Sequence, residues 1–265
     1  MRIDLSGRTA LVTGSTSGLG RATAAALARA GARVVVNGRT EQRVERAVAD
    51  LRAELPDAHI TGVAADVSRE ADVGRLVASV PEADVLVNNA GVYTTIPLFD
   101  VPDEEWRRLF EVNVLAGVRL ARHYVPRMAE RGWGRVVFVS SESAVLPPTE
   151  MVHYGVSKTA QLAVSRGMAQ EMAGTGVTVN AVLPGPACTE GIERYVAQRA
   201  RESDSSFAEA ERAVVAQVRP TSLVRRLIRP EEVADLIVYL ASDRSSATTG
   251  GALRVDGGIA PGLVP

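Results

Sequence analysis

Hydrophobic and polar positions along the chain follow two alternating patterns. Short runs rich in valine and other apolar residues are separated by longer stretches in which apolar residues recur every three or four positions. The first pattern is typical of buried strands and the second of amphipathic helices. We therefore predict strands at Thr9–Thr13, Arg33–Asn37, His59–Ala64, Asp84–Asn88, Arg135–Ser140, Val177–Val182 and Ala252–Val255.

Helices are predicted between these strands, over residues 18–30, 41–55, 69–79, 103–130, 152–174 and 230–242. Regular alternation of strand and helix predicts a doubly wound, Rossmann-type α/β fold, with about seven parallel strands and helices on both faces. No repeat or linker divides the chain, so we expect a single dinucleotide-binding domain over residues 1–265. Ligands of such folds bind at the carboxyl ends of the strands, where we look for chemistry.

The segment at about 186–229 departs from this rhythm because it is polar and rich in arginine, glutamate and serine. One interpretation is a substrate loop with one or two short helices over the cleft. The other is a disordered insertion. Both stay open at this point.

Composition excludes several classes of partner. The formal net charge is −1, so no long-range attraction to nucleic acid or to an anionic membrane is expected. No apolar run is long enough to span a bilayer, and the beginning of the chain lacks a signal-type apolar stretch, so a cytoplasmic protein is expected. The single cysteine, Cys188, allows no internal disulfide, and no His, Asp and Glu set has the spacing of a metal site.

One compositional feature points to chemistry. Lysine and arginine together number 30, and Lys158 is the only lysine. A lysine ammonium is compact and its charge can be tuned, whereas a guanidinium is broad, planar and always charged. The one position that keeps lysine is therefore a candidate for a role that arginine cannot fill.

A glycine-rich turn follows the first predicted strand directly. The spacing is G-x-x-x-G-x-G, and a helix is predicted to begin within it. Glycine lets the backbone turn sharply and approach a pyrophosphate, and the amides at a helix N-terminus favour an anion. The candidate phosphate-binding residues are Gly14, Ser17, Gly18, Leu19 and Gly20.

Residues after the second and third strands bear on which nicotinamide cofactor binds. An NAD-preferring site usually has an acid at the end of the second strand, but here Arg39 stands before the first acid, Glu41. Arg39 could pair with a 2′-phosphate, which favours NADP without excluding NAD; a solvated Arg39 is the alternative. Asp66, followed by Val67, could accept a hydrogen bond from adenine, and its alternative role is a helix N-cap.

Together these motifs and several others resemble the short-chain dehydrogenase/reductase superfamily, in its compact single-domain branch that includes 3-oxoacyl-carrier-protein reductases. The resemblance runs from Leu5 to Gly258. It rests on the glycine turn and, in order, on Asn88-Asn89-Ala90-Gly91, Asn113, Ser141, Tyr154-x-x-x-Lys158, Pro184-Gly185-Pro186 with Thr189, and Val255-Asp256-Gly257-Gly258.

Tyr154 and Lys158 are four residues apart on a predicted helix, so their side chains share one face. A phenol has an ordinary pKa near 10, and a neighbouring ammonium, like the positive ring of an oxidised nicotinamide, favours the phenolate. The resemblance implies that Tyr154 transfers the proton. It implies that Lys158 lowers the pKa of Tyr154 and binds the nicotinamide ribose.

The resemblance assigns roles to further residues. Ser141 would bond the substrate oxygen, and Asn113 would mark a helix distortion that holds a water linking Lys158 to solvent. Pro184, Gly185 and Thr189 would fix the nicotinamide carboxamide, and the residues at the adenosine ribose would be Asn88, Ala90 and Gly91.

Two residues beside this set are judged on local geometry. Glu142 could contact a polar or cationic substrate group or be a structural acid paired with an arginine. His153 precedes Tyr154, but its side chain should point about 100° away around the helix, so we do not expect it to be catalytic.

The predicted function is hydride transfer between a nicotinamide and a carbonyl or secondary alcohol, with Tyr154 as acid/base and NADPH-driven reduction as the favoured direction. A dehydratase or epimerase on the same fold is one alternative, and a nicotinamide-binding sensor or scaffold without turnover is another. The substrate would be a small molecule. The resemblance further implies a homotetramer, formed through the helices at 103–130 and 152–174.

Overall fold

The computed structural model of the chain describes residues 3–262. Its centre is one seven-stranded sheet with the order β3-β2-β1-β4-β5-β6-β7, in which every neighbouring pair is parallel. This order confirms the Rossmann-type prediction. The strands are β1 (Thr9–Val12), β2 (Arg33–Gly38), β3 (Ile60–Ala64), β4 (Val85–Asn88), β5 (Gly134–Val139), β6 (Val177–Pro184) and β7 (Ala252–Val255).

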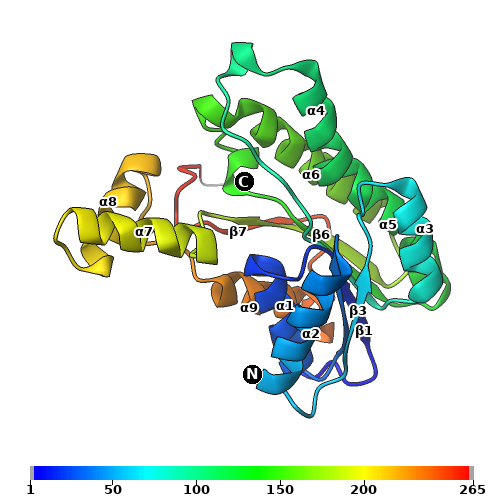
Figure 1. Cartoon of the computed structure of the whole chain (residues 1–265). Coiled ribbons are helices and arrows are strands. Elements are labelled where there is room, and N and C mark those ends of the chain that lie inside the picture. Colours follow the sequence, from blue (N-terminus) through cyan, green and yellow to red (C-terminus); the bar gives the residue numbers. More distant parts are fainter. Residues whose placement is uncertain (1–2, 263–265) are drawn as a thin grey trace.

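Helices cover both faces of the sheet (Figure 1). One layer is formed by α1 (Gly18–Arg29), α2 (Glu41–Glu54) and α9 (Pro230–Leu240). The other contains α3 (Glu70–Ser79), α5 (Ala116–Glu130) and α6 (Val152–Glu171), with α4 (Asp103–Phe110) beside it. Short 3-10 turns lie at Leu98–Asp100, Glu142–Ala144, Thr149–Met151 and Asp243–Ser245.

The strands β1, β2, β4 and β5 are largely apolar because both of their faces are buried. In β1, Ala10 and Val12 pack into the core under α1, α2 and α9, whereas Leu11 between them packs into the core on the opposite face. Successive strand residues point to opposite faces, so a strand covered on both sides needs apolar residues at every position. Each fully buried leucine or valine contributes roughly 1.5–3 kcal/mol to folding.

The prediction of a single helix over residues 103–130 is wrong in one respect. The structure divides it into α4, a π-helical turn at Glu111–Leu115 and α5. Within this turn the N–H of Ala116 bonds to the carbonyl oxygen of Glu111, five residues earlier. The distortion surrounds Asn113, where the sequence predicted one.

The segment 186–229 contains the predicted short helices, α7 (Glu190–Glu202) and α8 (Phe207–Val218). They pack on each other at one side of the molecule (Figure 1). Ser206 begins α8 with a capping box to Glu209. The pair has a small apolar core of its own, formed by Val196, Ala200, Ala210, Val214, Val215 and Leu227.

Within residues 3–262, no helix is long and apolar enough to cross a membrane. Nor does any group of three or more His, Cys, Asp or Glu residues in that range form a candidate metal site.

Candidate active site

The turn after β1 requires its glycines for steric reasons. Gly14 has a φ of +61°, and a Cβ there would lie 2.9 Å from the Cα of Ala90. A Cβ on Gly20 would lie 2.8 Å from the Cα of Ser15. Gly18 has a φ of +55° and faces Thr189, the residue before α7. The turn therefore folds tightly and brings α1 close to β4 and to the segment after β6.

Asn89 joins this turn to the end of β4. Its Nδ2 donates to the carbonyl oxygens of Thr13, at 2.9 Å, and Gly14, at 3.1 Å. Asn88, which was predicted to line the adenosine-ribose side, instead turns its buried amide toward Gly117 of α5. Because alternate strand residues face opposite sides of a sheet, the cavity receives Asn89 and not Asn88.

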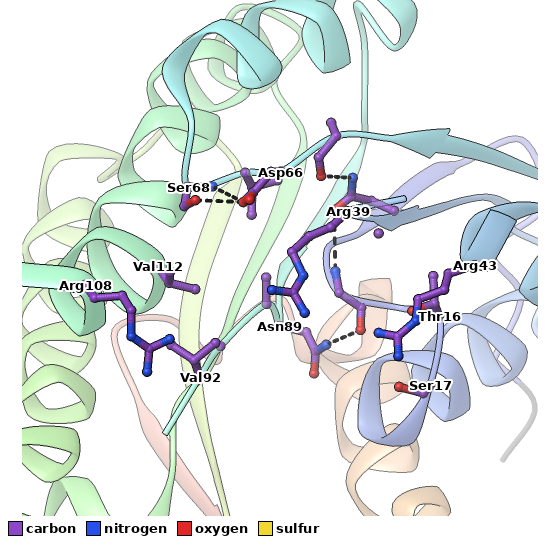
Figure 2. Close-up of a pocket in the computed structure, with 17 residues that line it drawn as sticks. Thr16, Ser17, Arg39, Arg43, Asp66, Ser68, Asn89, Val92, Arg108 and Val112 are labelled. Atoms are coloured by element: carbon purple, nitrogen blue, oxygen red, sulfur yellow. Dashed lines mark hydrogen bonds between the residues drawn. The ribbon is translucent and has the colours of Figure 1, made fainter. Parts of the chain in front are cut away.

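A cavity of about 410 Å³ opens beside the turn, at the carboxyl ends of β1, β2, β3 and β4 (Figure 2). It lies where the strand order changes direction between β1 and β4, the usual ligand position in such sheets. The predicted cofactor residues that line it are Gly14, Ser17, Arg39, Asp66, Val67, Ala90 and Gly91.

Three arginines line this cavity: Arg108 of α4, which pairs with Glu105, and two near the end of β2. Arg39 follows β2, and Arg43 lies in the first turn of α2. Figure 2 shows both side chains extending beside the cavity, with the guanidinium of Arg43 near Thr16 and Ser17. Within residues 3–262 neither guanidinium forms an ion pair. Arg43 was missed in the sequence, although its position four residues after Arg39 was a usable signal.

Asp66 lines the same cavity after β3. One of its carboxylate oxygens accepts from the backbone N–H of Ser68, at 3.1 Å, and from the Ser68 hydroxyl, at 2.7 Å. The alternative role of Asp66 as a helix N-cap is wrong, since α3 begins at Glu70 and Arg69 is the residue before it.

A second cavity, of about 420 Å³, lies at the carboxyl ends of β5 and β6. Leu19 of the glycine turn lines it, so the turn contributes to both cavities. The segment 186–229 supplies Ile192, Val218 and Arg219 to its wall. The predicted site residues found here are Leu19, Ser141, Tyr154, Pro184, Gly185 and Thr189.

The hydroxyl of Ser141 is engaged within the protein. It accepts from the N–H of Ser143 at 3.1 Å and donates to the Glu142 carboxylate at 2.6 Å. The other oxygen of Glu142 accepts from Arg219 Nε at 2.8 Å, and the Glu142 side chain is 3 % exposed. Of the two interpretations of Glu142, the paired structural acid is the one observed, in the wall of the second cavity.

Tyr154, in the first turn of α6, faces the same cavity. Burial raises the pKa of its phenol above the ordinary value; the Ser141 hydroxyl opposes this shift, and the Glu142 carboxylate adds to it. The predicted lowering of this pKa by Lys158 is therefore not produced by the side chains of the protein alone. With these side chains around it the phenol stays protonated near neutral pH.

Lys158 lies one turn later on α6 and is 3 % exposed. Its Nζ is 5.7 Å from the centre of the Tyr154 ring and donates to the carbonyl oxygen of Val139 at 3.0 Å. No carboxylate within residues 3–262 forms an ion pair with it. Burial lowers the pKa of Lys158 to about 8. The ammonium is thus held by neutral acceptors only.

Asn113 is buried in the π-helical turn. Its Oδ1 accepts from the N–H of Val92 at 2.8 Å, and its Nδ2 donates to the carbonyl oxygen of Val92, at 3.0 Å, and to Ser157 Oγ, at 2.9 Å. These bonds join α6 to the chain that leaves β4. The backbone carbonyl of Asn113 accepts from Gln161, which in turn bonds to Lys158.

His153 takes no part in either cavity. It is fully buried, and its Nε2 lies 2.9 Å from Thr94 Oγ1. Its ring also stands edge-on to Trp106, and burial lowers its pKa. The expectation that its side chain points away from the Tyr154 site is confirmed.

Comparison with known proteins identifies the family. A family model described as enoyl-(acyl carrier protein) reductase matches residues 14–260. The chain belongs to the short-chain dehydrogenase/reductase family. Like the relatives described next, it is an oxidoreductase.

Among the relatives of this short-chain dehydrogenase/reductase, the oxidoreductase YvaG of Bacillus subtilis is 46% identical over 98% of both chains. The D-beta-hydroxybutyrate dehydrogenase of Rhizobium meliloti is 33% identical over 95% of this chain and 98% of that one. The crystal structure of L-sorbose reductase from Gluconobacter frateurii, complexed with NADPH and L-sorbose, is 32% identical. It covers 99% of this chain and 100% of its own, with a TM-score of 0.91.

Proposed function

We propose that this short-chain dehydrogenase/reductase uses NADPH to reduce the carbonyl group of a small polar molecule, with Tyr154 as the proton donor. The observation that carries the proposal is the position of Tyr154 and Ser141 on one cavity, with the Lys158 ammonium buried 5.7 Å from the phenol ring. The relative solved with NADPH and L-sorbose supports the same chemistry.

The proposed cofactor would lie along both cavities. Its pyrophosphate would rest on the glycine turn, and its nicotinamide would face Tyr154 beside Pro184, Gly185 and Thr189. When bound, the nicotinamide supplies the hydride. The glycines let the turn fold tightly against the end of β4, and the N-terminus of α1, which begins at Gly18, fits the pyrophosphate of a dinucleotide.

In the proposed reduction, Tyr154 donates its proton to the substrate oxygen as negative charge develops there. Ser141 stabilises that charge, for which its hydrogen has to turn from Glu142 toward the substrate. The Lys158 ammonium favours the phenolate left on Tyr154. The raised pKa of Tyr154 keeps the phenol protonated at the start, as this direction requires.

Preference for NADPH is proposed from Arg39 and Arg43. Both border the end of the cavity beside the glycine turn, and neither has an internal carboxylate partner within residues 3–262. Among residues 3–262, Asp66 is the only acid that lines that cavity, and it follows β3, not β2. An adenosine 2′-phosphate near the end of β2 would therefore meet two cations and no acid.

Arg39→Asp is expected to weaken NADPH binding by about 1.5–3 kcal/mol, the range for a hydrogen bond to a charged group. This corresponds to a roughly 10- to 100-fold higher Kd. NADH affinity is expected to stay the same or improve. The measurement is a titration of each variant with NADPH and NADH, followed by nicotinamide fluorescence.

Arg46→Asp is the matched control. Arg46 is an exposed residue of α2 that does not line the cavity, so its substitution makes the same change of charge away from the proposed phosphate site. Equal NADPH affinity in Arg39→Asp and Arg46→Asp would show that Arg39 is only solvated. Tighter binding of NADH than of NADPH by the unmodified protein would overturn the cofactor assignment altogether.

The substrate class is tested by a panel measured through NADPH absorbance. L-Sorbose, acetoacetate and an acetoacetyl thioester represent sugars, short oxo acids and acyl thioesters. Measurable turnover of one class supports reduction and identifies that class. NADPH binding without turnover of any carbonyl compound would favour the sensor alternative, although an intact Tyr154 and Lys158 pair argues for chemistry.

The homotetramer is proposed from the family resemblance, and light scattering in solution tests it.

A further inference from the structure

Gln161 is a buried polar residue for which the steps proposed above give no role. It follows Lys158 by three residues on α6 and is 2 % exposed. Its Oε1 accepts from Lys158 Nζ at 3.3 Å, and its Nε2 donates to the backbone carbonyl oxygen of Asn113. Each end of the amide therefore meets a group of the opposite hydrogen-bonding type.

The Asn113 carbonyl belongs to the π-helical turn. The five-residue bonding in this turn displaces the backbone ladder locally, and such turns are frequent at functional sites. The side-chain amide of Asn113 bonds to Val92 and Ser157. The bond from Gln161 thus provides the carbonyl oxygen of this buried residue with a donor.

Lys158 depends on few acceptors. Its bonds to protein groups go to the carbonyl oxygen of Val139 and to the amide oxygen of Gln161, and no carboxylate among residues 3–262 is paired with it. A buried ammonium is favoured over the neutral amine only as far as such acceptors stabilise its charge. Within residues 3–262, Gln161 is the one side chain that accepts a hydrogen bond from the Lys158 ammonium.

We infer that Gln161 is a positioning residue that holds the Lys158 ammonium charged and fixed beneath Tyr154, by bridging it to the Asn113 carbonyl. The inference rests on the proposed function of Tyr154 and Lys158. The bridge stands where the family resemblance implied a water between Asn113 and Lys158. An amide N–H is too weak an acid to pass on a proton, so in this chain the bridge fixes the lysine and does not relay its proton.

The first test measures Lys158 directly. Because the chain has one lysine, protein grown with lysine labelled at the ε-carbon gives a single ε-carbon NMR signal, whose pH titration reports the pKa of Lys158. We expect a midpoint near 8 in the unmodified protein. Gln161→Met keeps the length of the side chain without its polar atoms, and we expect it to lower the midpoint by about one pH unit.

Gln161→Ala supplies the discriminating comparison, because it removes the bridge but leaves room for a water to replace it. We expect its midpoint to lie between those of the unmodified protein and Gln161→Met. Gln170→Met, on an exposed position of the same helix, is the control and should not shift it. An unchanged midpoint in both Gln161 variants would overturn the inference.

Turnover gives an independent ranking. If Gln161 positions Lys158, kcat should fall about tenfold further in Gln161→Met than in Gln161→Ala, and NADPH affinity should change little in either variant. Thermal stability should rank the other way, because Gln161→Ala leaves the larger cavity and should melt at a lower temperature. If Gln161 only fills space, kcat would follow thermal stability and Gln161→Ala would be the slower enzyme. An inactive unmodified protein would count against the proposed function, and the lysine titration would still decide the role of Gln161.

Discussion

Tyr154→Phe is expected to reduce kcat by about 1000-fold, within the range for loss of a general acid. The substitution removes one hydroxyl and keeps the ring, so packing around α6 should not change. Affinity for NADPH should stay within about threefold of the unmodified protein, because the proposed cofactor contacts of the glycine turn are untouched. Initial rates with the best carbonyl substrate and a fluorescence titration measure the two quantities.

Tyr93→Phe is the control for Tyr154→Phe. Tyr93 borders the same cavity, and its ring centre is 6.1 Å from that of Tyr154, but its side chain is 65% exposed. We expect less than a threefold change in kcat. A Tyr154→Phe enzyme that retains a tenth or more of the original kcat would rule out Tyr154 as the proton donor.

Lys158→Arg is the second change with a large expected effect, a loss of about 100-fold or more in kcat. The site is 3 % exposed and closely lined, since even a Cβ on Gly91 would lie 3.3 Å from Lys158 Nζ. A guanidinium is wider and carries five donors, whereas the protein offers it the two acceptors that Lys158 uses. Displacement of the charge by about 1 Å is enough for such a loss.

Folding and chemistry can be separated in this variant. Overpacking should lower the free energy of unfolding by about 1–3 kcal/mol, which denaturant melts would detect while circular dichroism still reports a folded chain. Arg166→Lys, the opposite exchange at an exposed position of α6, should change neither stability nor kcat. A folded Lys158→Arg enzyme with near-normal kcat would contradict the interpretation that catalysis requires lysine at this position.

The fold and much of the site follow from local information in the sequence. Period-two and period-3.6 patterns are properties of short windows, and strict alternation of strand and helix leaves few arrangements other than a parallel sheet covered on both faces. The glycine turn is equally local, because positive φ at Gly14 and Gly18 is a constraint of the backbone itself. The spacing of Tyr154 and Lys158 likewise puts both side chains on one helix face before any packing is known.

What the sequence left open depends on contacts between distant segments. Glu142 finds Arg219 across 77 positions, so its pairing appears only when α8 ends above the cavity. Whether Asn88 or Asn89 faces the turn depends on the exact end of β4, where a shift of one residue reverses the side-chain direction. Gln161 looks like an ordinary polar helix residue until the π-helical turn places the Asn113 carbonyl opposite it.

The pKa of Tyr154 is the clearest case. From the sequence, a lysine four residues away predicts a lowered value. In the folded chain, burial and the Glu142 carboxylate raise it. A pKa depends on how deeply the group is buried and on the positions of all neighbouring charges and hydrogen-bond partners. The spacing of two residues along one helix does not contain this information.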